Sequence, residues 1–140
     1  LENTMKSKLE HANLIVKNID ETILFLRTAL PDFVIRNDAT DKDRNRWVHI
    51  GNSDYYLSLN SADIKKKENN QMPYSGRIGL NHLGFIVHDV DEVRSRLISA
   101  GYIKSTECLE TKYRKSIYFY DNENRDWEFV QYFTADREKK

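Results

Sequence analysis

Two stretches of the chain decide its fold: HANLIVKNIDE at residues 11–21 and HLGFIVHDVDE at residues 82–92. The second stretch begins 71 residues after the first, and five of the eleven aligned positions are identical. Other positions pair residues of similar size or polarity, such as Leu14 with Phe85 and Asn18 with Asp89. Self-similarity of this kind is the signature of a duplicated structural unit. The chain is therefore predicted to contain one module twice.

Each copy begins with a strand pattern and continues with a helix pattern. Apolar residues alternate over residues 12–16 and again over residues 83–87, which is the period of a strand with one buried face. They then recur at helical spacing in residues 19–30 and 90–98. We expect Asp20 and Asp91 to act as helix N-caps, Pro31 to stop the first helix and Gly101 to follow the second.

Three further strands are expected after each helix, and they complete two βαβββ modules. They are residues 33–36, 46–50 and 55–60 in the first copy, and residues 102–104, 116–120 and 126–132 in the second. Module 1 then covers about residues 8–60, a polar linker covers 61–79, and module 2 covers about 80–133 of one domain, residues 5–140. We predict an α+β fold in which the two modules form a curved mixed sheet around a cavity, with the helices outside.

Composition limits the partners that such a protein can have. The chain has 140 residues, with 22 Lys and Arg against 22 Asp and Glu, so its formal net charge is zero. Nucleic acids and anionic membranes draw on an excess of positive charge, so neither is expected as a partner. No apolar run approaches the ~20 residues of a membrane span, and the single Cys108 excludes an internal disulfide. We expect a cytoplasmic protein that binds a small molecule.

The strand pattern also indicates a candidate metal site. His11 and His82 begin the two copies of the first strand, on the face opposite the aliphatic side chains. Glu128 stands between Trp127 and Phe129, so it faces the cavity if that aromatic pair faces the helices. Two imidazoles and one carboxylate bind a divalent metal and leave positions open for water or substrate. We predict that His11, His82 and Glu128 bind Zn, Mn, Fe, Co or Ni, and that Glu128 is catalytic.

The hairpin around residues 51–54 predicts further side chains in the cavity. If these four residues form the loop, His49 pairs with Tyr56 and Trp47 pairs with Ser58. All four would then face inward, because opposed residues share a face of the sheet. His49 becomes a candidate catalytic proton shuttle, and Trp47, Tyr56 and Ser58 become candidate substrate contacts.

These motifs resemble those of the vicinal oxygen chelate superfamily. The resemblance rests on the two repeated stretches and on YFYDNENRDWE at residues 118–128, and it extends from Leu9 to Tyr132. The superfamily comprises glyoxalase I, bleomycin-resistance proteins, fosfomycin-resistance enzymes, methylmalonyl-CoA epimerase and extradiol dioxygenases. Ser58 falls where glyoxalase I has a carboxylate ligand, so the resemblance implies a set of two His and one Glu, as in extradiol dioxygenases and fosfomycin-resistance enzymes.

The resemblance implies further properties of the chain. KSIYFYD at residues 115–121 is similar to a stretch of fosfomycin-resistance enzymes in which a serine contacts the phosphonate, so Ser116 is a candidate substrate contact. Members of the superfamily usually form homodimers, and some exchange modules between chains. The function implied is a divalent-metal-dependent enzyme acting on a small oxygen-rich substrate: a lyase or isomerase, a dioxygenase, or a transferase or hydrolase similar to fosfomycin-resistance enzymes.

Two other functions remain open from the sequence. The first is a metal-free binding protein of the bleomycin-resistance type, in which aromatic side chains form a wall for the ligand. These side chains would be Trp47, Tyr56, Tyr113 and Phe119, with Phe119 also a candidate substrate contact in the enzyme. The second is an interaction domain whose histidines only hydrogen-bond to Glu128.

Overall fold

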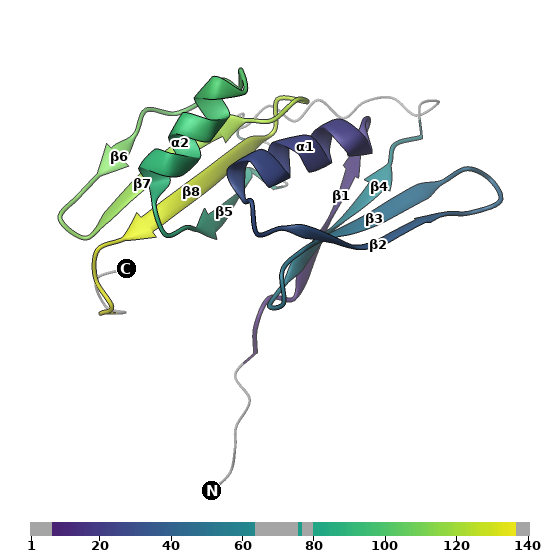
Figure 1. Cartoon of the computed structure of the whole chain (residues 1–140), viewed down its shortest axis with the longest axis horizontal. Coiled ribbons are helices and arrows are strands. Elements are labelled where there is room, and N and C mark those ends of the chain that lie inside the picture. The colour runs from purple at the N-terminus through teal and green to yellow at the C-terminus, as the bar shows by residue number, and fades with distance from the viewer. Residues whose placement is uncertain (1–6, 64–75, 77–79, 137–140) are drawn as a thin grey trace, which may run out of the picture.

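The computed structural model describes residues 7–63, 76 and 80–136 and contains two βαβββ modules (Figure 1). Module 1 consists of β1 (His11–Val16), α1 (Ile19–Ala29), β2 (Val34–Thr40), β3 (Arg46–Gly51) and β4 (Tyr56–Ser61). Module 2 consists of β5 (His82–Ile86), α2 (Val90–Ser99), β6 (Leu109–Glu110), β7 (Arg114–Tyr120) and β8 (Asp126–Tyr132). The predicted repeat and element order are confirmed.

Each module has its own four-stranded sheet. The strand orders are β1-β4-β3-β2 and β5-β8-β7-β6, so the two sheets have the same topology. The first and last strands of each module are parallel neighbours, and the other pairs are antiparallel. The strand expected at residues 102–104 is reduced to a single bridge between Lys104 and Phe119, and β6 follows it. Most of the predicted linker lies outside the described residues.

One hydrophobic core runs through both modules, between the helices and the sheets (Figure 1). Phe25 of α1 lies 5.8 Å from Trp127 of β8, measured between ring centroids, and Phe33 lies 5.8 Å from Phe85 of β5. Burial of one such side chain stabilises a fold by about 1.5–3 kcal/mol. Because these contacts cross from one module to the other, the modules of one chain pack as one unit.

The helices begin two residues earlier than the sequence pattern suggested. The N-caps are Asn18, whose side chain accepts a hydrogen bond from the Glu21 amide, and Asp89, which accepts from the Asp91 and Glu92 amides. The prediction that Asp20 and Asp91 are the caps was therefore wrong. Asn and Asp are equally good caps, so the residue type does not distinguish position 18 from 20, and positions 89 and 91 are both Asp. The residues that follow the observed caps, Ile19 and Val90, are buried.

The repeated Asp20 and Asp91 instead tie each helix to the sheet of its own module. Asp20 pairs with Arg46 of β3 at 2.9 Å, and Asp91 pairs with Lys115 of β7 at 2.9 Å. Arg46 also pairs with Asp38 of β2, and the hydrogen bond from Arg46 lowers the pKa of the Asp38 carboxyl below its ordinary value. The repetition of this aspartate thus has a structural explanation in both modules.

Polar contacts from module 2 hold both ends of α1. The Glu123 carboxylate, in the β7–β8 hairpin, accepts from the Lys17 and Asn18 amides at 2.8 and 3.0 Å, just before the helix. At the other end, Arg96 of α2 donates to the carbonyls of Thr28 and Ala29 at 3.0 and 3.2 Å. Anions at a helix N-terminus and cations at a C-terminus are both favourable. These contacts fix the orientation of one module on the other.

Replacing Arg96 by methionine is expected to lower the free energy of unfolding by about 1–3 kcal/mol, the range for hydrogen bonds made by a charged group. Methionine retains the aliphatic part of the side chain, so the loss of stability comes from the missing hydrogen bonds to the two carbonyls at the end of α1. Urea denaturation of Arg96→Met measures the change. Arg94→Met, two residues away and exposed, is the control and should stay within ~0.5 kcal/mol of the parent; equal losses in both variants would contradict the contact's role.

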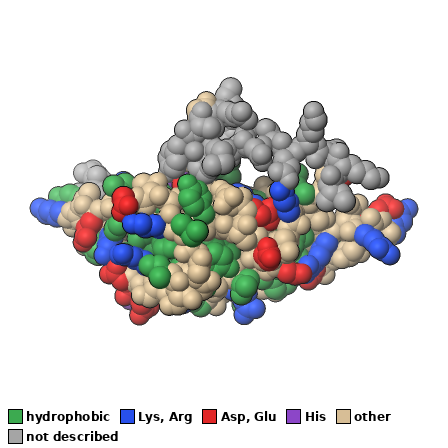
Figure 2. Space-filling model, turned by 90° about the horizontal axis from the view of Figure 1, so that it is seen from above, with side chains coloured by type: hydrophobic (Ala, Val, Ile, Leu, Met, Phe, Trp, Pro, Cys, Tyr) green, Lys and Arg blue, Asp and Glu red, His purple; other side chains and the backbone are tan. Residues whose placement is uncertain are grey.

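Charged side chains of both signs are interspersed on the face seen in Figure 2, in keeping with the zero net charge. Among the described residues, none of the helices is both long enough and apolar enough to cross a bilayer.

Candidate functional site

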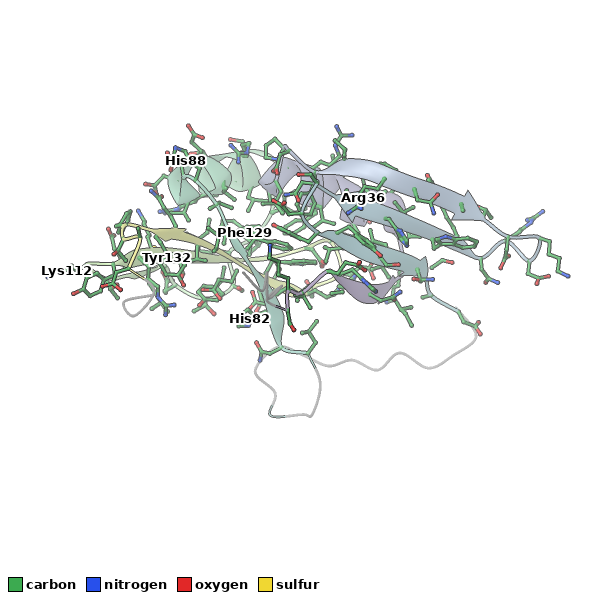
Figure 3. All side chains as sticks on the ribbon, turned by 90° about the horizontal axis from the view of Figure 1, so that it is seen from below. Arg36, His82, His88, Lys112, Phe129 and Tyr132 are labelled. Atoms are coloured by element: carbon green, nitrogen blue, oxygen red, sulfur yellow. The ribbon has the colours of Figure 1, made fainter. Side chains whose placement is uncertain are left out.

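Each sheet has one face against the helices and one face away from them, and the polar site residues lie on the second face. In Figure 3, Phe129 lies inside the molecule, whereas His82 lies on the side of the sheet opposite the helices. Trp127 and Phe129 are both fully buried, and Glu128 between them points the other way. The predicted alternation in β8 is confirmed. We call the two faces turned away from the helices the open faces.

His82 and Glu128 meet on the open face of module 2. The distance between His82 Nε2 and Glu128 Oε2 is 3.1 Å, and the side chains are 27% and 16% exposed. Tyr118 of β7 packs edge-on against the His82 ring, with centroids 5.7 Å apart. A nitrogen and an oxygen ligand are thus held side by side on adjacent strands, partly shielded from water but still accessible. This donor pair fits a divalent cation.

Gly84 leaves space beside this pair. It lies opposite Glu128 in the parallel pairing of β5 with β8, and a Cβ at this position would lie 3.4 Å from Glu128 Oε2. Module 1 has Asn13 at the equivalent position, and its amide donates to Ser58 Oγ at 3.2 Å and to Asn60 Oδ1 at 2.9 Å. In module 1 the Asn13 side chain therefore fills the space that Gly84 leaves open beside the Glu128 carboxylate in module 2.

The open face of module 1 carries a cluster of three rings in contact, of which one pair is stacked and the other tilted by 31°. His11 of β1 stacks on Tyr56 of β4 with centroids 5.0 Å apart, and His49 of β3 lies 4.7 Å from the same ring. Glu10 accepts from His11 Nδ1 at 2.8 Å and from the Tyr56 hydroxyl at 3.3 Å. The hydrogen bond from His11 is the main reason that the pKa of Glu10 lies below its ordinary value, with a smaller contribution from Tyr56.

The three predicted metal ligands do not meet within one chain. His11 belongs to the sheet of module 1, while His82 and Glu128 belong to the sheet of module 2. In the described part of the chain, no three His, Cys, Asp or Glu side chains are grouped so that they could hold a metal ion. A curved sheet within the chain was expected to bring all three together. Instead the modules share a core on the helix side. Two of the three predicted metal ligands, His82 and Glu128, lie next to each other, and His11 lies on the other sheet.

The β3–β4 hairpin has the predicted facing but a different register. His49 pairs with Ser58 and Trp47 pairs with Asn60, a shift of two residues from the expected pairs. The loop begins after Gly51, because the Asn52 side chain accepts from the Asp54 and Tyr55 amides and tightens the turn. A shift of two leaves every side chain on its original face, so Trp47, His49 and Ser58 still lie on the open face.

The remaining candidates are divided between the open face and the core. Ser116 is 1% exposed on the open-face side of β7, and its hydroxyl has no hydrogen-bond partner within the described residues. Phe119, in contrast, is 2% exposed and pairs with Trp127 in the core on the helix side. The expectation that Phe119 lines the pocket is corrected here: residues 116 and 119 differ by an odd number, so they lie on opposite faces of the strand.

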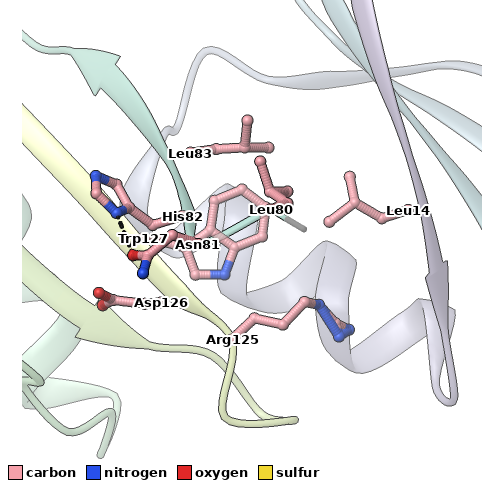
Figure 4. Close-up of a pocket in the computed structure, with 8 residues that line it drawn as sticks. All are labelled: Leu14, Leu80, Asn81, His82, Leu83, Arg125, Asp126 and Trp127. Carbon is pink, nitrogen blue, oxygen red and sulfur yellow. Dashed lines mark hydrogen bonds between the residues drawn. The ribbon is translucent and has the colours of Figure 1, made fainter. Parts of the chain in front are cut away.

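A small cavity lies beside His82, between the modules (Figure 4). It is lined by Leu14 of β1 and by residues of module 2, including Arg125 and Trp127, and has a volume of about 60 Å³. This is the space of about two water molecules. The cavity is therefore too small for an organic molecule of several heavy atoms.

Three contributors to the site were not identified from the sequence. Glu10 and Asn81 each contact the histidine that follows them. They occupy equivalent positions of the repeat, so an alignment of the two copies could have identified them. Arg36 lies in a β-bulge between Ile35 and Asn37, and its guanidinium is 4.6 Å from the centroid of the Tyr56 ring. A bulge redirects a side chain without leaving a clear sequence pattern.

The fold is shared with solved structures of known proteins. A comparison with family models finds no match to the sequence, and no curated protein is detectably similar to it. A glyoxalase family protein from Bacillus cereus superposes with a TM-score of 0.77 at 13% identity, over 96% of this chain and 99% of the other. A glyoxylase/bleomycin resistance protein/dioxygenase domain from Frankia sp. has a TM-score of 0.74 at 21% identity, over 94% and 96%.

The third structure is the fosfomycin resistance protein FosX from Listeria monocytogenes, solved with Mn(II) and sulfate. Its TM-score is 0.71 at 24% identity, and the match covers 97% of this chain and 100% of that one. A variant of the same FosX was solved with Mn(II) and 1S,2S-dihydroxypropylphosphonic acid. At these identities the comparison establishes the architecture. The chain therefore has the fold of the vicinal oxygen chelate superfamily, as its repeated motifs predicted.

Proposed function

We propose that the protein is a divalent-metal-dependent enzyme that acts on a small oxygen-rich substrate, with His11, His82 and Glu128 as the metal ligands. The observation that carries this proposal is the pairing of His82 Nε2 with Glu128 Oε2 at 3.1 Å on an open, partly shielded face. The similar fold of FosX, solved with Mn(II), supports it. A bound divalent ion would polarise substrate oxygens and stabilise negative charge that develops on them.

We further propose that the third ligand, His11, comes from a second copy of the chain. The shared core and the contacts at both ends of α1 hold the two modules in one relative orientation. The two open faces of one chain could meet only if these contacts were lost. Ile15 and Ile86, at equivalent positions of these faces, are 71% and 68% exposed. In a homodimer, the face of module 1 would cover that of module 2 in the partner, bury these side chains and add His11 to the pair.

The side chains around the metal ligands would bind and orient the substrate. The Ser116 hydroxyl is buried without a hydrogen-bond partner among the described residues, so it would donate a hydrogen bond to a substrate oxygen. From module 1, Trp47, Tyr56 and Ser58 would contact the substrate, and His49 would accept or return a proton. This arrangement suits substrates with two adjacent oxygens, such as diols, hydroxyketones and epoxides with a neighbouring anionic group.

A metal-free binding protein is the second candidate, and the ring cluster of His11, Tyr56 and His49 favours it. Aromatic side chains offer a large contact area to an aromatic ligand. Thermal shift assays distinguish the two functions. An aromatic ligand that raises the Tm in the presence of chelator supports the binding protein, whereas stabilisation by Mn, Fe, Co, Ni or Zn that chelator reverses supports the enzyme.

A mixed dimer tests the shared site. One chain carries His11→Ala, the other carries Glu128→Ala, and the pair is co-expressed with two different affinity tags and purified through both. In the mixed dimer, one of the two sites is complete and the other lacks both ligands. We expect each homodimeric variant to bind almost no metal and the mixed dimer to bind half of the parent's content. A mixed dimer that binds no metal would contradict ligand sharing between chains.

Enlarging Gly84 is expected to weaken metal binding without weakening the fold. In Gly84→Val the new methyl groups occupy the space beside Glu128 Oε2, while a β-branched residue replaces a glycine in a strand. We expect the metal affinity to fall by about tenfold or more and the Tm to stay the same or rise. Ile98→Val, at an exposed position of α2 on the other side of the sheet, is the control and should change neither. A parallel fall in Tm and affinity for Gly84→Val would show that the glycine is needed only for folding.

A further inference from the structure

We propose that Glu10 and Asn81 are positioning residues that determine which ring nitrogen of His11 and His82 is available to a metal ion. Each stands immediately before its histidine, and the two are equivalent residues of the repeat. Glu10 Oε1 lies 2.8 Å from His11 Nδ1, and Asn81 Oδ1 lies 2.8 Å from His82 Nδ1, drawn as a dashed line in Figure 4. This inference rests on the proposed function.

The chemistry of the two partners fixes the proton on Nδ1. An ionised carboxylate and an amide oxygen can only accept a hydrogen bond, so the imidazole nitrogen facing them donates it. In His11 the proton of a neutral ring then stays on Nδ1, and Nε2 keeps its lone pair. His82 has an oxygen beside each ring nitrogen, Asn81 Oδ1 at Nδ1 and Glu128 Oε2 at 3.1 Å from Nε2. A cation bound between Nε2 and Glu128 Oε2 would take the place of a proton there, while Asn81 keeps the proton on Nδ1.

Glu10 is itself held in place by the strand that neighbours β1. The Tyr56 hydroxyl donates to Glu10 Oε1 at 3.3 Å, and the Tyr56 amide donates to the Glu10 carbonyl at 3.1 Å. The Tyr56 ring also stacks on His11 at 10° between the ring planes. Tyr56 therefore contacts both members of the pair and limits rotation of the imidazole. Outer-shell hydrogen bonds of this type orient metal-binding histidines in other proteins.

The tautomer of His11 is the direct test, and it is measured on the metal-free protein. A histidine ring free in water favours the Nε2–H form, so a ring that carries its proton on Nδ1 is diagnostic. Nitrogen-15 NMR at a pH where the ring is neutral should show mainly Nδ1–H in the parent. We expect Glu10→Leu to restore the Nε2–H form and Glu10→Gln, which keeps an acceptor oxygen, to retain Nδ1–H. A parent with Nε2–H, or a Glu10→Leu variant without change, would overturn the proposal.

For Asn81 the measurement is the dissociation constant for Co(II), followed by its visible spectrum. Asn81→Leu removes the acceptor and should weaken Co(II) binding by about tenfold, whereas Asn81→Asp keeps an oxygen and should stay within a few-fold of the parent. Equal losses in both variants, or none in Asn81→Leu, would contradict a positioning role. If the parent itself binds no Co(II), the proposed function fails, and the His11 tautomer still decides whether Glu10 orients the ring.

Discussion

Replacing Glu128 by alanine is expected to abolish divalent-metal binding and leave the fold intact. Glu128 supplies the only carboxylate that contacts the His82 ring nitrogen among the contacts described above, and its side chain lies on an open face, 16% exposed. Loss of an outer-shell partner already weakens metal binding by about 10- to 100-fold, and loss of a ligand exceeds this. The hydrophobic core is on the other side of β8, so packing is little affected.

The measurement is isothermal titration with Mn(II), Co(II) and Zn(II), with urea denaturation in parallel. Glu107→Ala is the matched control, because it removes a carboxylate that is 83% exposed and pairs with Lys104. The control should bind metal like the parent, and Glu128→Ala should unfold within about 1 kcal/mol of it. Metal binding by Glu128→Ala with unchanged affinity would remove Glu128 from the ligand set.

Replacing Asp121 by alanine is expected to cost about 3–5 kcal/mol of folding free energy, the loss typical when one partner of a buried charge pair is removed. The Asp121 side chain is fully buried at the start of the β7–β8 hairpin. It accepts hydrogen bonds from the Glu123 and Arg125 amides at 2.8 and 3.0 Å and from Trp127 Nε1 at 3.0 Å, and it pairs with Arg125. Alanine would leave the buried indole N–H and a guanidinium without this acceptor.

A second turn of the same chain is the control for this loss. Asp41, at the β2–β3 hairpin, accepts from the Asp43 and Asn45 amides at 2.8 and 3.0 Å, the same two positions in the turn, but is exposed. Asp41→Ala should therefore cost no more than ~1 kcal/mol. Comparing the urea midpoints of the two variants separates the stability that comes from the turn hydrogen bonds from the stability that comes from the buried contacts with Trp127 and Arg125. Equal losses would show that the turn alone, and not the contact with Trp127, stabilises the hairpin.

The facing of side chains could be predicted from the sequence, and the register could not. Alternation in β1, β4, β5 and β8 separates core from open face, because a strand has a period of two. The pairing of His49 depends on the Asn52 turn, which moved the hairpin by two residues and was not recognised in the sequence. The error left the candidate site unchanged only because the shift was even. Phe119 was misplaced because it was chosen as an aromatic residue and not by its position in the alternation.

The relation between the modules was the larger unknown. The repeat predicts two similar modules, but nothing in its pattern says which faces meet. That choice depends on contacts between distant residues, such as Phe25 with Trp127 and Arg96 with the end of α1. These contacts bring the helix sides together and leave His11 on a different sheet from His82 and Glu128. The residues of the candidate site could be proposed from the sequence, whereas their division between two faces required the structure.

The most direct test of the account is the metal content of the protein. Tag-free protein is stripped with chelator, reloaded separately with Mn, Fe, Co, Ni and Zn, and analysed for bound metal after removal of the excess. We predict one divalent ion per chain for at least one of these metals, and its loss in His82→Ala. A protein that retains none of the five under any reloading condition would contradict the metal-dependent function and favour the binding protein.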